Sequence, residues 1–87
     1  MITVAKLDEH TFNVTVAGQS TTTHMVTVDS AYYQKLTGGR VPVEDLVKRS
    51  FEFLLDRESN TSILTRFDLP VIGHYFPEYE GVITQKI

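Results

Sequence analysis

The sequence predicts an α+β fold, in which a three-stranded antiparallel meander is followed by a short helix, one long amphipathic helix and short C-terminal helical turns. Three observations support this prediction. Apolar and polar residues alternate over residues 12–16 and 22–28. An apolar stripe with helical spacing runs through residues 43–58. Two prolines and a glycine within residues 70–77 then divide a third apolar segment, so that it cannot form one helix.

The length and charge of the chain limit the classes of protein that it can represent. Its 87 residues correspond to one domain, residues 1–87. Such a domain should bury only about 60–65% of the surface that its unfolded chain exposes. Eight Lys and Arg residues against eleven Asp and Glu residues give a formal net charge of −3. Nucleic-acid binding is therefore disfavoured, because phosphate contacts require an excess of basic residues.

The absence of cysteine excludes a disulfide framework and a thiolate metal site, and it suits a cytoplasmic protein. No apolar run approaches the roughly 20 residues that a membrane span needs. The N-terminal residues lack the basic region and the apolar region of a signal peptide. We therefore expect a soluble, unprocessed cytoplasmic protein with no membrane partner.

The first part of the chain is typical of three strands joined by two short turns. Ile2 to Leu7 precedes a turn at residues 8–10, and a second turn falls at residues 18–20. After each turn, apolar residues alternate with polar ones, as in strands with one buried face. The predicted inner face holds Phe12, Val14, Val16, Val26 and Val28, and the predicted outer face holds Thr11, Asn13, Thr15, Thr23 and Thr27.

Two helices are predicted after the strands. Asp29 is a good N-cap for a short helix over residues 30–36, and Gly38 can end it because glycine adopts the left-handed C-cap conformation without steric cost. Pro42, favoured at the first helical position, opens a long helix through residues 43–58. Its apolar stripe comprises Val43, Leu46, Val47, Ser50, Phe53 and Leu54, widened by Phe51 and Leu55. A stripe of this width predicts two packing partners, the sheet and the C-terminal segment.

The C-terminal segment is rich in apolar residues but interrupted by proline and glycine. Residues 62–67 are predicted to form a short helical turn, and Asp68 is the predicted N-cap of another short helix that ends at Tyr75, before Pro77. Residues 79–87 alternate weakly, which leaves a loose tail and a fourth edge strand both open. The side chains expected to dock on the long helix are Ile63, Leu64, Phe67, Val71 and Ile72.

The sequence has no catalytic, cofactor or metal signature. His10, His24 and His74 form no His-x-His or His-x-x-x-His pair, so we predict no metal site. We expect His24 to be a hydrogen-bonded residue at the rim of the core. Neither Ser50 nor Ser62 lies in a nucleophile elbow, and Ser50 is interpreted as a small residue that allows close helix packing. We therefore predict a protein that is not an enzyme and needs no cofactor.

Aromatic residues near the C-terminus are the strongest candidates for a binding site. Tyr and Phe are favoured in protein interfaces as well as in cores, and bends at a surface often hold recognition residues. The bend around Pro77 should present part of Tyr75, Phe76 and Tyr79 outward. These three residues are the predicted partner-binding site.

A series of short motifs occupies the second half of the chain. It consists of Ser50-Phe-Glu-Phe-Leu-Leu55, Ser62-Ile-Leu64, Phe67-Asp-Leu-Pro-Val-Ile72 and Tyr75-Phe-Pro-Glu-Tyr79. In this pattern the chain resembles a family of small uncharacterised bacterial proteins. The resemblance implies a bacterial, cytoplasmic protein and no particular activity, cofactor or partner.

Two kinds of function are compatible with these features. The favoured one is a small protein-interaction or self-associating domain without catalytic activity, which binds a protein partner or a second copy. The alternative is a nucleic-acid-linked regulator, because strands followed by helices also resemble, in topology alone, antitoxin modules of the HicB type. An exposed apolar patch near the C-terminus would support the first. The second would require one face that gathers Lys6, Lys35, Arg40, Lys48, Arg49, Arg57 or Arg66, with aromatic residues between them.

Overall fold

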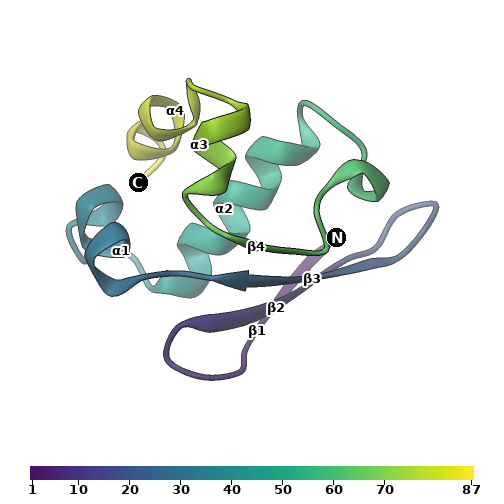
Figure 1. Ribbon diagram of the computed structural model, residues 1–87, viewed down its shortest axis with the longest axis horizontal. Coiled ribbons are helices and arrows are strands. Elements are labelled where there is room, and N and C mark those ends of the chain that lie inside the picture. Colours follow the sequence, from purple (N-terminus) through teal and green to yellow (C-terminus); the bar gives the residue numbers. More distant parts are fainter.

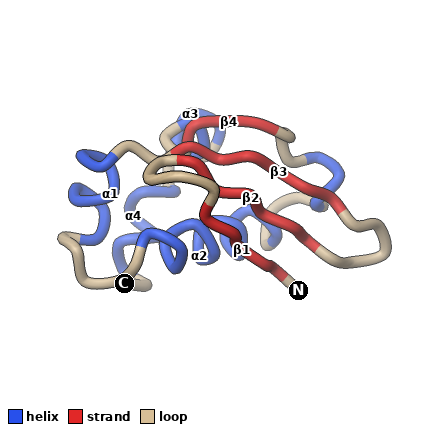
Figure 2. The backbone as a smooth tube through the Cα atoms, turned by 90° about the horizontal axis from the view of Figure 1, so that it is seen from below, coloured by secondary structure: helices blue, strands red, loops and turns tan.

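The computed structural model describes all 87 residues and contains one four-stranded sheet with helices on one side (Figures 1 and 2). The strand order is β1-β2-β3-β4, with β1 at Ile2–Lys6, β2 at Thr11–Val16, β3 at Thr22–Thr27 and β4 at Arg66–Asp68. The first three strands are antiparallel neighbours, which confirms the predicted meander for this part of the sheet only. The α+β class is also confirmed.

β4 was not expected, and it makes the sheet mixed. It runs parallel to β3 and places Phe67 opposite Val26. The predicted helical turn over residues 62–67 is wrong, because the chain forms a single 3₁₀ turn, η1 at Asn60–Ser62, and is then extended at Ile63. A strand of three residues is too short to show period-two alternation, so its pattern could not be recognised.

The two helices after the meander follow the sequence prediction closely. In α1, Ser30–Thr37, the Asp29 carboxylate accepts a hydrogen bond from the Ala31 N–H at 3.2 Å, and Gly38 ends the helix with a φ of 61°. α2 spans Val43–Leu55 and therefore ends earlier than predicted. Pro42 is the N-cap of α2, not its first residue. The fixed φ of proline suits either position.

The C-terminal residues form two short helices, α3 at Val71–Tyr75 and α4 at Tyr79–Gln85. α3 confirms the predicted helix that ends at Tyr75, but Pro70 occupies its N-cap and Asp68 belongs to β4. α4 shows that the loose tail and the fourth edge strand were both wrong for residues 79–87. Its inward positions, Tyr79 and Ile83, are four residues apart and fully buried, as expected for a helix.

The core lies between the sheet and the helices that cover one of its faces. Figure 2 shows the strands in front of the helices, with no element on the near side of the sheet. All five residues of the predicted inner face are buried, and the predicted outer-face residues are half-buried or exposed. None of the helices has both the length and the apolar composition of a membrane span.

α2 has the two packing partners that its wide stripe predicted. On the sheet side, the Phe51 ring lies 5.4 Å from the His24 ring and 6.0 Å from the Phe67 ring, measured between centroids. On the other side, the Phe53 ring makes edge contacts with Phe76 and Tyr79 at 5.9 and 5.2 Å. The C-terminal helices therefore complete the core around α2.

Candidate functional site

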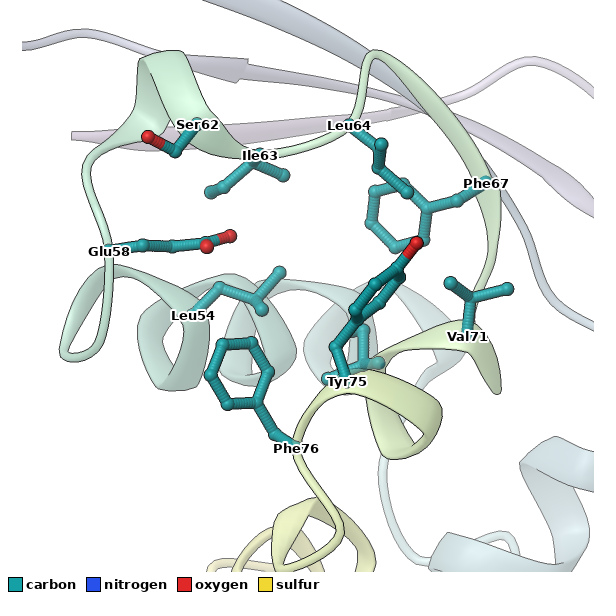
Figure 3. A pocket seen from close by; sticks show the side chains of 10 residues that line it. Leu54, Glu58, Ser62, Ile63, Leu64, Phe67, Val71, Tyr75 and Phe76 are labelled. Atoms are coloured by element: carbon teal, nitrogen blue, oxygen red, sulfur yellow. The ribbon is translucent and has the colours of Figure 1, made fainter.

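An apolar groove lies beside the C-terminal half of α2, between the segment that leads into β4 and the helix α3 (Figure 3). Its volume is about 310 Å³. Ten residues line it, and all of them except Glu58 and Ser62 are hydrophobic. The ten are Leu54, Glu58, Ser62, Ile63, Leu64, Phe67, Val71, Ile72, Tyr75 and Phe76. A groove of this size can take one or two apolar side chains and is near the lower limit, roughly 300 Å³, for small-molecule sites.

The floor of the groove is part of the core, whereas its rim is exposed. Ile63 and Phe67 retain only 5% and 8% of their accessible surface, but Leu64 and Tyr75 retain 47% and 62%. Leu64 and Tyr75 are two of the four large hydrophobic residues that the molecule exposes. Exposed apolar residues gathered at a concave surface are typical of binding sites.

Proline determines the geometry of the α3 side of the groove. Pro77 drives the residue before it out of the helical region, and Phe76 is accordingly extended, with φ −128° and ψ 90°. As a result, the Phe76 ring points toward Leu54, while the Tyr75 ring points toward Leu64 and Phe67 (Figure 3). The two aromatic residues thus line opposite parts of the groove.

One end of the groove is polar. Figure 3 shows the Glu58 carboxylate directed toward the space between Leu54 and Ile63. Glu58 takes part in neither of the two ion pairs, Lys35–Glu80 and Arg57–Glu78. The adjacent Arg57 is already engaged, because its guanidinium lies 3.6 Å from the Phe53 ring centroid and its Nε is 3.2 Å from a Glu78 oxygen. Glu58 therefore places an unneutralised negative charge beside an apolar surface.

The three predicted partner-binding residues have different positions. Tyr75 is exposed on the rim, and Phe76 is half-buried in the groove wall. The expected outward orientation of Tyr79 is wrong, because its side chain is fully buried against Phe53. Tyr79 belongs to the inward side of α4, a helix that the weak alternation of residues 79–87 did not indicate. Its ring contacts Phe53, which in turn contacts Phe76 in the groove wall.

The Tyr79 hydroxyl finds a partner inside the core. It lies 2.6 Å from Ser50 Oγ, which also donates a hydrogen bond to the Leu46 carbonyl at 2.7 Å. Burial raises the pKa of Tyr79 above its ordinary value of 10.0. Ser50 is thus a hydrogen-bonding residue as well as a small one, and no histidine contacts it.

The expected docking residues also divide between core and rim. Ile63, Phe67 and Ile72 are buried, and the contact between the Phe67 and Phe51 rings confirms the predicted packing on α2 for Phe67. Val71 is half-buried. The prediction for Leu64 is wrong, since its side chain is largely exposed. Because the backbone is extended at Ile63 and not helical, the next side chain, Leu64, does not share the inward direction of Ile63.

The histidines are structural or peripheral. His24 is buried, and its Nδ1–H donates to the Leu64 carbonyl at 2.8 Å while Nε2 contacts Thr22 Oγ1 at 2.8 Å. This confirms that His24 is hydrogen-bonded, but its expected position at the rim of the core is wrong, because its side chain is only 1% exposed. Through the Leu64 carbonyl, His24 also holds the groove rim. His10 Nδ1 lies 3.2 Å from the Val28 carbonyl, and His74 is exposed beside Tyr75. Nowhere do three His, Asp or Glu side chains converge as metal ligands would.

A second hollow, of about 260 Å³, lies near the start of α2. It includes Lys6, Glu9, His10 and Glu44, and only three of its nine lining residues are hydrophobic. Its mixed charges lie on exposed or half-buried side chains and give it little apolar surface to bury. The apolar groove is the stronger candidate site.

Comparison with protein-family models, with curated proteins and with solved structures finds no match to this chain.

Proposed function

We propose that the protein is a non-catalytic protein-interaction domain that binds an apolar segment of a partner protein in the groove between α2, β4 and α3. The partner segment supplies one or two apolar side chains and, next to them, a basic residue that pairs with Glu58. Of the three partner-binding residues predicted from the sequence, Tyr75 and Phe76 contact the partner, and Tyr79 supports them from the core. The exposure of Leu64 and Tyr75 around a concave apolar surface is the observation that carries the proposal.

The exposed rim favours a partner that buries it. Each square ångström of apolar surface removed from water contributes about 25 cal/mol, so covering Leu64 and Tyr75 would contribute to binding. Tyrosine is also among the residues that most often dominate interface energetics. A partner side chain between Tyr75 and Leu54 would contact the Tyr75 ring on one side and the Phe76 ring on the other.

The charge at the end of the groove favours a basic residue in the partner. Glu58 is half-buried and makes no ion pair within the chain. A Lys or Arg beside the apolar anchor would gain an ion pair in a partly desolvated position, where it is worth more than at an exposed surface. Recognition of this kind selects partners by charge as well as by shape.

The cytoplasmic location and bacterial origin implied by the sequence belong to this proposal. A chain without cysteine gains nothing from an oxidising compartment. The partner would then be another protein of the same compartment.

The nucleic-acid-linked alternative has less support. The basic residues come from β1, α1, the α1–α2 loop, α2, the segment that follows α2, β4 and the end of the chain after α4. Two of them, Lys35 and Arg57, are in ion pairs with Glu80 and Glu78. The net charge of −3 further opposes approach to a phosphate backbone. No contact in the structure favours this function over protein binding.

Selection from a phage-displayed library of random linear peptides tests the proposal. We expect enriched peptides to combine large apolar residues with a Lys or Arg. Their binding should be abolished by Leu64→Glu, which places a charge on the rim, and weakened by Glu58→Gln, which removes the charge at the groove end. Gln34→Glu is the matched control for Leu64→Glu, because it adds the same charge at an exposed position of α1.

NMR chemical-shift changes on peptide addition provide the second readout, since they should be largest at the groove residues. The proposal fails if no peptide is enriched, or if the selected peptides bind the Leu64→Glu variant as well as the unmodified protein. It also fails if shifts cluster elsewhere on the molecule. If the Glu58→Gln variant binds the selected peptides as tightly as the unmodified protein does, the pairing of a basic partner residue with Glu58 is refuted.

A further inference from the structure

β1 is an edge strand whose outer side is unpaired. Met1 and Ala17 exchange backbone hydrogen bonds of 3.0 and 2.9 Å, and the Leu7 N–H donates to the Thr11 carbonyl at 2.8 Å. In an antiparallel ladder, hydrogen-bonded pairs alternate with non-hydrogen-bonded pairs along the strand. Between Met1 and Leu7, the backbone groups of Thr3 and Ala5 therefore also point toward β2. The N–H and C=O groups of Ile2, Val4 and Lys6 consequently point away from the sheet.

This edge lacks the features that usually prevent strand pairing. β4, the opposite edge, has only three residues, two of them charged, and Pro70 follows soon after it. β1 has five residues, no proline and a single charge, at Lys6. Unprotected edges of this length are templates for another strand. A strand added here would extend the sheet and continue its hydrogen bonding.

Exposed apolar side chains flank the same edge. The molecule exposes four large hydrophobic residues, and the two that do not belong to the groove are Met1, 88% exposed, and Leu7, 55% exposed. They stand at the two ends of β1 on the open face of the sheet. On the other face, Ile2 and Val4 pack on the core but are only partly covered. Both faces of the edge therefore have apolar surface to bury.

The edge is complementary to itself. In an antiparallel pairing of two β1 strands with Val4 opposite Val4, each outward-facing residue finds a partner, because Ile2 then lies opposite Lys6 of the second copy. The same register places Met1 of one copy beside Leu7 of the other, in a non-hydrogen-bonded pair where side chains are closest. Shifting either strand by two residues leaves an outward residue unpaired and separates Met1 from Leu7.

We infer that the protein forms a two-fold symmetric dimer through β1, in which Val4 faces its symmetry mate and two four-stranded sheets join into one. The dimer is concentration-dependent, because one short strand pair buries little surface compared with obligate interfaces. The groove lies at the opposite edge of the sheet, beside β4, and remains free for its partner. The dimer is thus independent of the proposed groove function.

Sedimentation velocity at increasing protein concentration tests the dimer, with Val4→Pro as the main variant. Proline removes the N–H that points outward and is tolerated at an edge where that group makes no bond within the monomer. We expect Val4→Pro to raise the dimer dissociation constant by roughly tenfold or more, because two hydrogen bonds at the two-fold axis are lost. Val4→Ala, which keeps the N–H, should have a smaller effect. Circular dichroism checks that each variant is folded.

Leu7→Lys gives a second test that does not depend on proline. Leu7 is exposed in the monomer, so the change should leave its stability intact while it places a charge opposite Met1 of the second copy. We expect the dimer to be weakened. If the unmodified protein remains a monomer at every concentration, or if Val4→Pro and Leu7→Lys dimerise as it does, the inference is overturned.

Disulfide trapping tests the register, and the absence of natural cysteine makes it specific. Thr3 and Ala5 of the second copy form a non-hydrogen-bonded pair, whose Cα separation of about 4.5 Å suits a disulfide. The double variant Thr3→Cys/Ala5→Cys should give a covalent dimer under mild oxidation. Either single change should not, because the two introduced thiols would then be diagonal neighbours. Equal cross-linking by the single variants would overturn the register.

Discussion

The hydroxyl of Tyr79 lies 2.6 Å from Ser50 Oγ in the interior between α4 and α2. Ser50 has one hydroxyl proton and donates it to the Leu46 carbonyl, so the Tyr79 O–H is the donor of this pair. Both residues are fully buried. This hydrogen bond joins α4 to α2, and together with the Phe53 contact it places Tyr79, an expected interface residue, in the core.

We expect Ser50→Ala to destabilise the protein more than Tyr79→Phe does. Ser50→Ala leaves a buried O–H without an acceptor and should cost about 1–3 kcal/mol, whereas Tyr79→Phe removes the donor and should cost about 1 kcal/mol. In the double variant the unpaired O–H is absent, so the combined loss should be smaller than the sum of the single losses. Urea unfolding of all four proteins measures the difference, and strictly additive losses would contradict the pairing.

Phe53→Ala should destabilise the protein by roughly 3–5 kcal/mol, a large share of the stability of so small a domain. The Phe53 ring is fully buried and contacts the rings of both Phe76 and Tyr79. Leu55→Ala, at a half-buried position of the same helix, is the control and should cost less. An unchanged melting temperature of the Phe53→Ala variant would show that α2 does not organise the core.

Glu80 should make the stability of the protein depend on pH in the acidic range. A hydrogen bond from the Tyr32 hydroxyl at 2.8 Å and the Lys35 ammonium at 3.2 Å hold the pKa of Glu80 below its ordinary value of 4.5. Because the folded-state pKa is the lower one, the folded protein favours the charged form. The contribution of Glu80 to the free energy of unfolding is therefore complete above about pH 4.5. It is lost as the pH falls through the lowered folded-state pKa.

Urea midpoints measured from neutral pH to below pH 4.5 check this expectation. The Glu80→Gln variant should be less stable than the unmodified protein at neutral pH, and the difference should shrink as the pH falls. Glu52→Gln, at an exposed position of α2, is the matched control. A difference that stays constant or grows toward acid would contradict the assigned role of Glu80.

Removal of metal should leave the melting temperature unchanged. The chain has no cysteine, and no three His, Asp or Glu side chains converge in the structure. Thermal unfolding with and without EDTA, together with elemental analysis of the purified protein, measures this. Stoichiometric zinc, or a melting temperature that falls by several degrees in the chelator, would show that a metal contributes to folding.

The local sequence pattern was sufficient to predict the strands and helices of the first two thirds of the chain. The alternation of Phe12, Val14 and Val16 predicts the buried face of β2 because successive side chains of a strand point to opposite faces. Asp29 and Gly38 predict both ends of α1 because their conformational and hydrogen-bonding preferences act locally. The stripe of α2 predicts a helix with two packing partners, since it is wider than one interface requires.

In the last third, local pattern predicted only α3, and tertiary structure decided the other elements. β4 and α4 have three and seven residues, too few for either period to stand out, and each is stabilised by distant groups. His24 holds the carbonyl of Leu64 as the chain enters β4, and Ser50 holds the hydroxyl of Tyr79 in α4. The exposure of Leu64 and the burial of Tyr79 follow from these long-range contacts. The aromatic composition near Pro77 indicated a binding site, but packing on α2 selected which aromatic residues reach the surface.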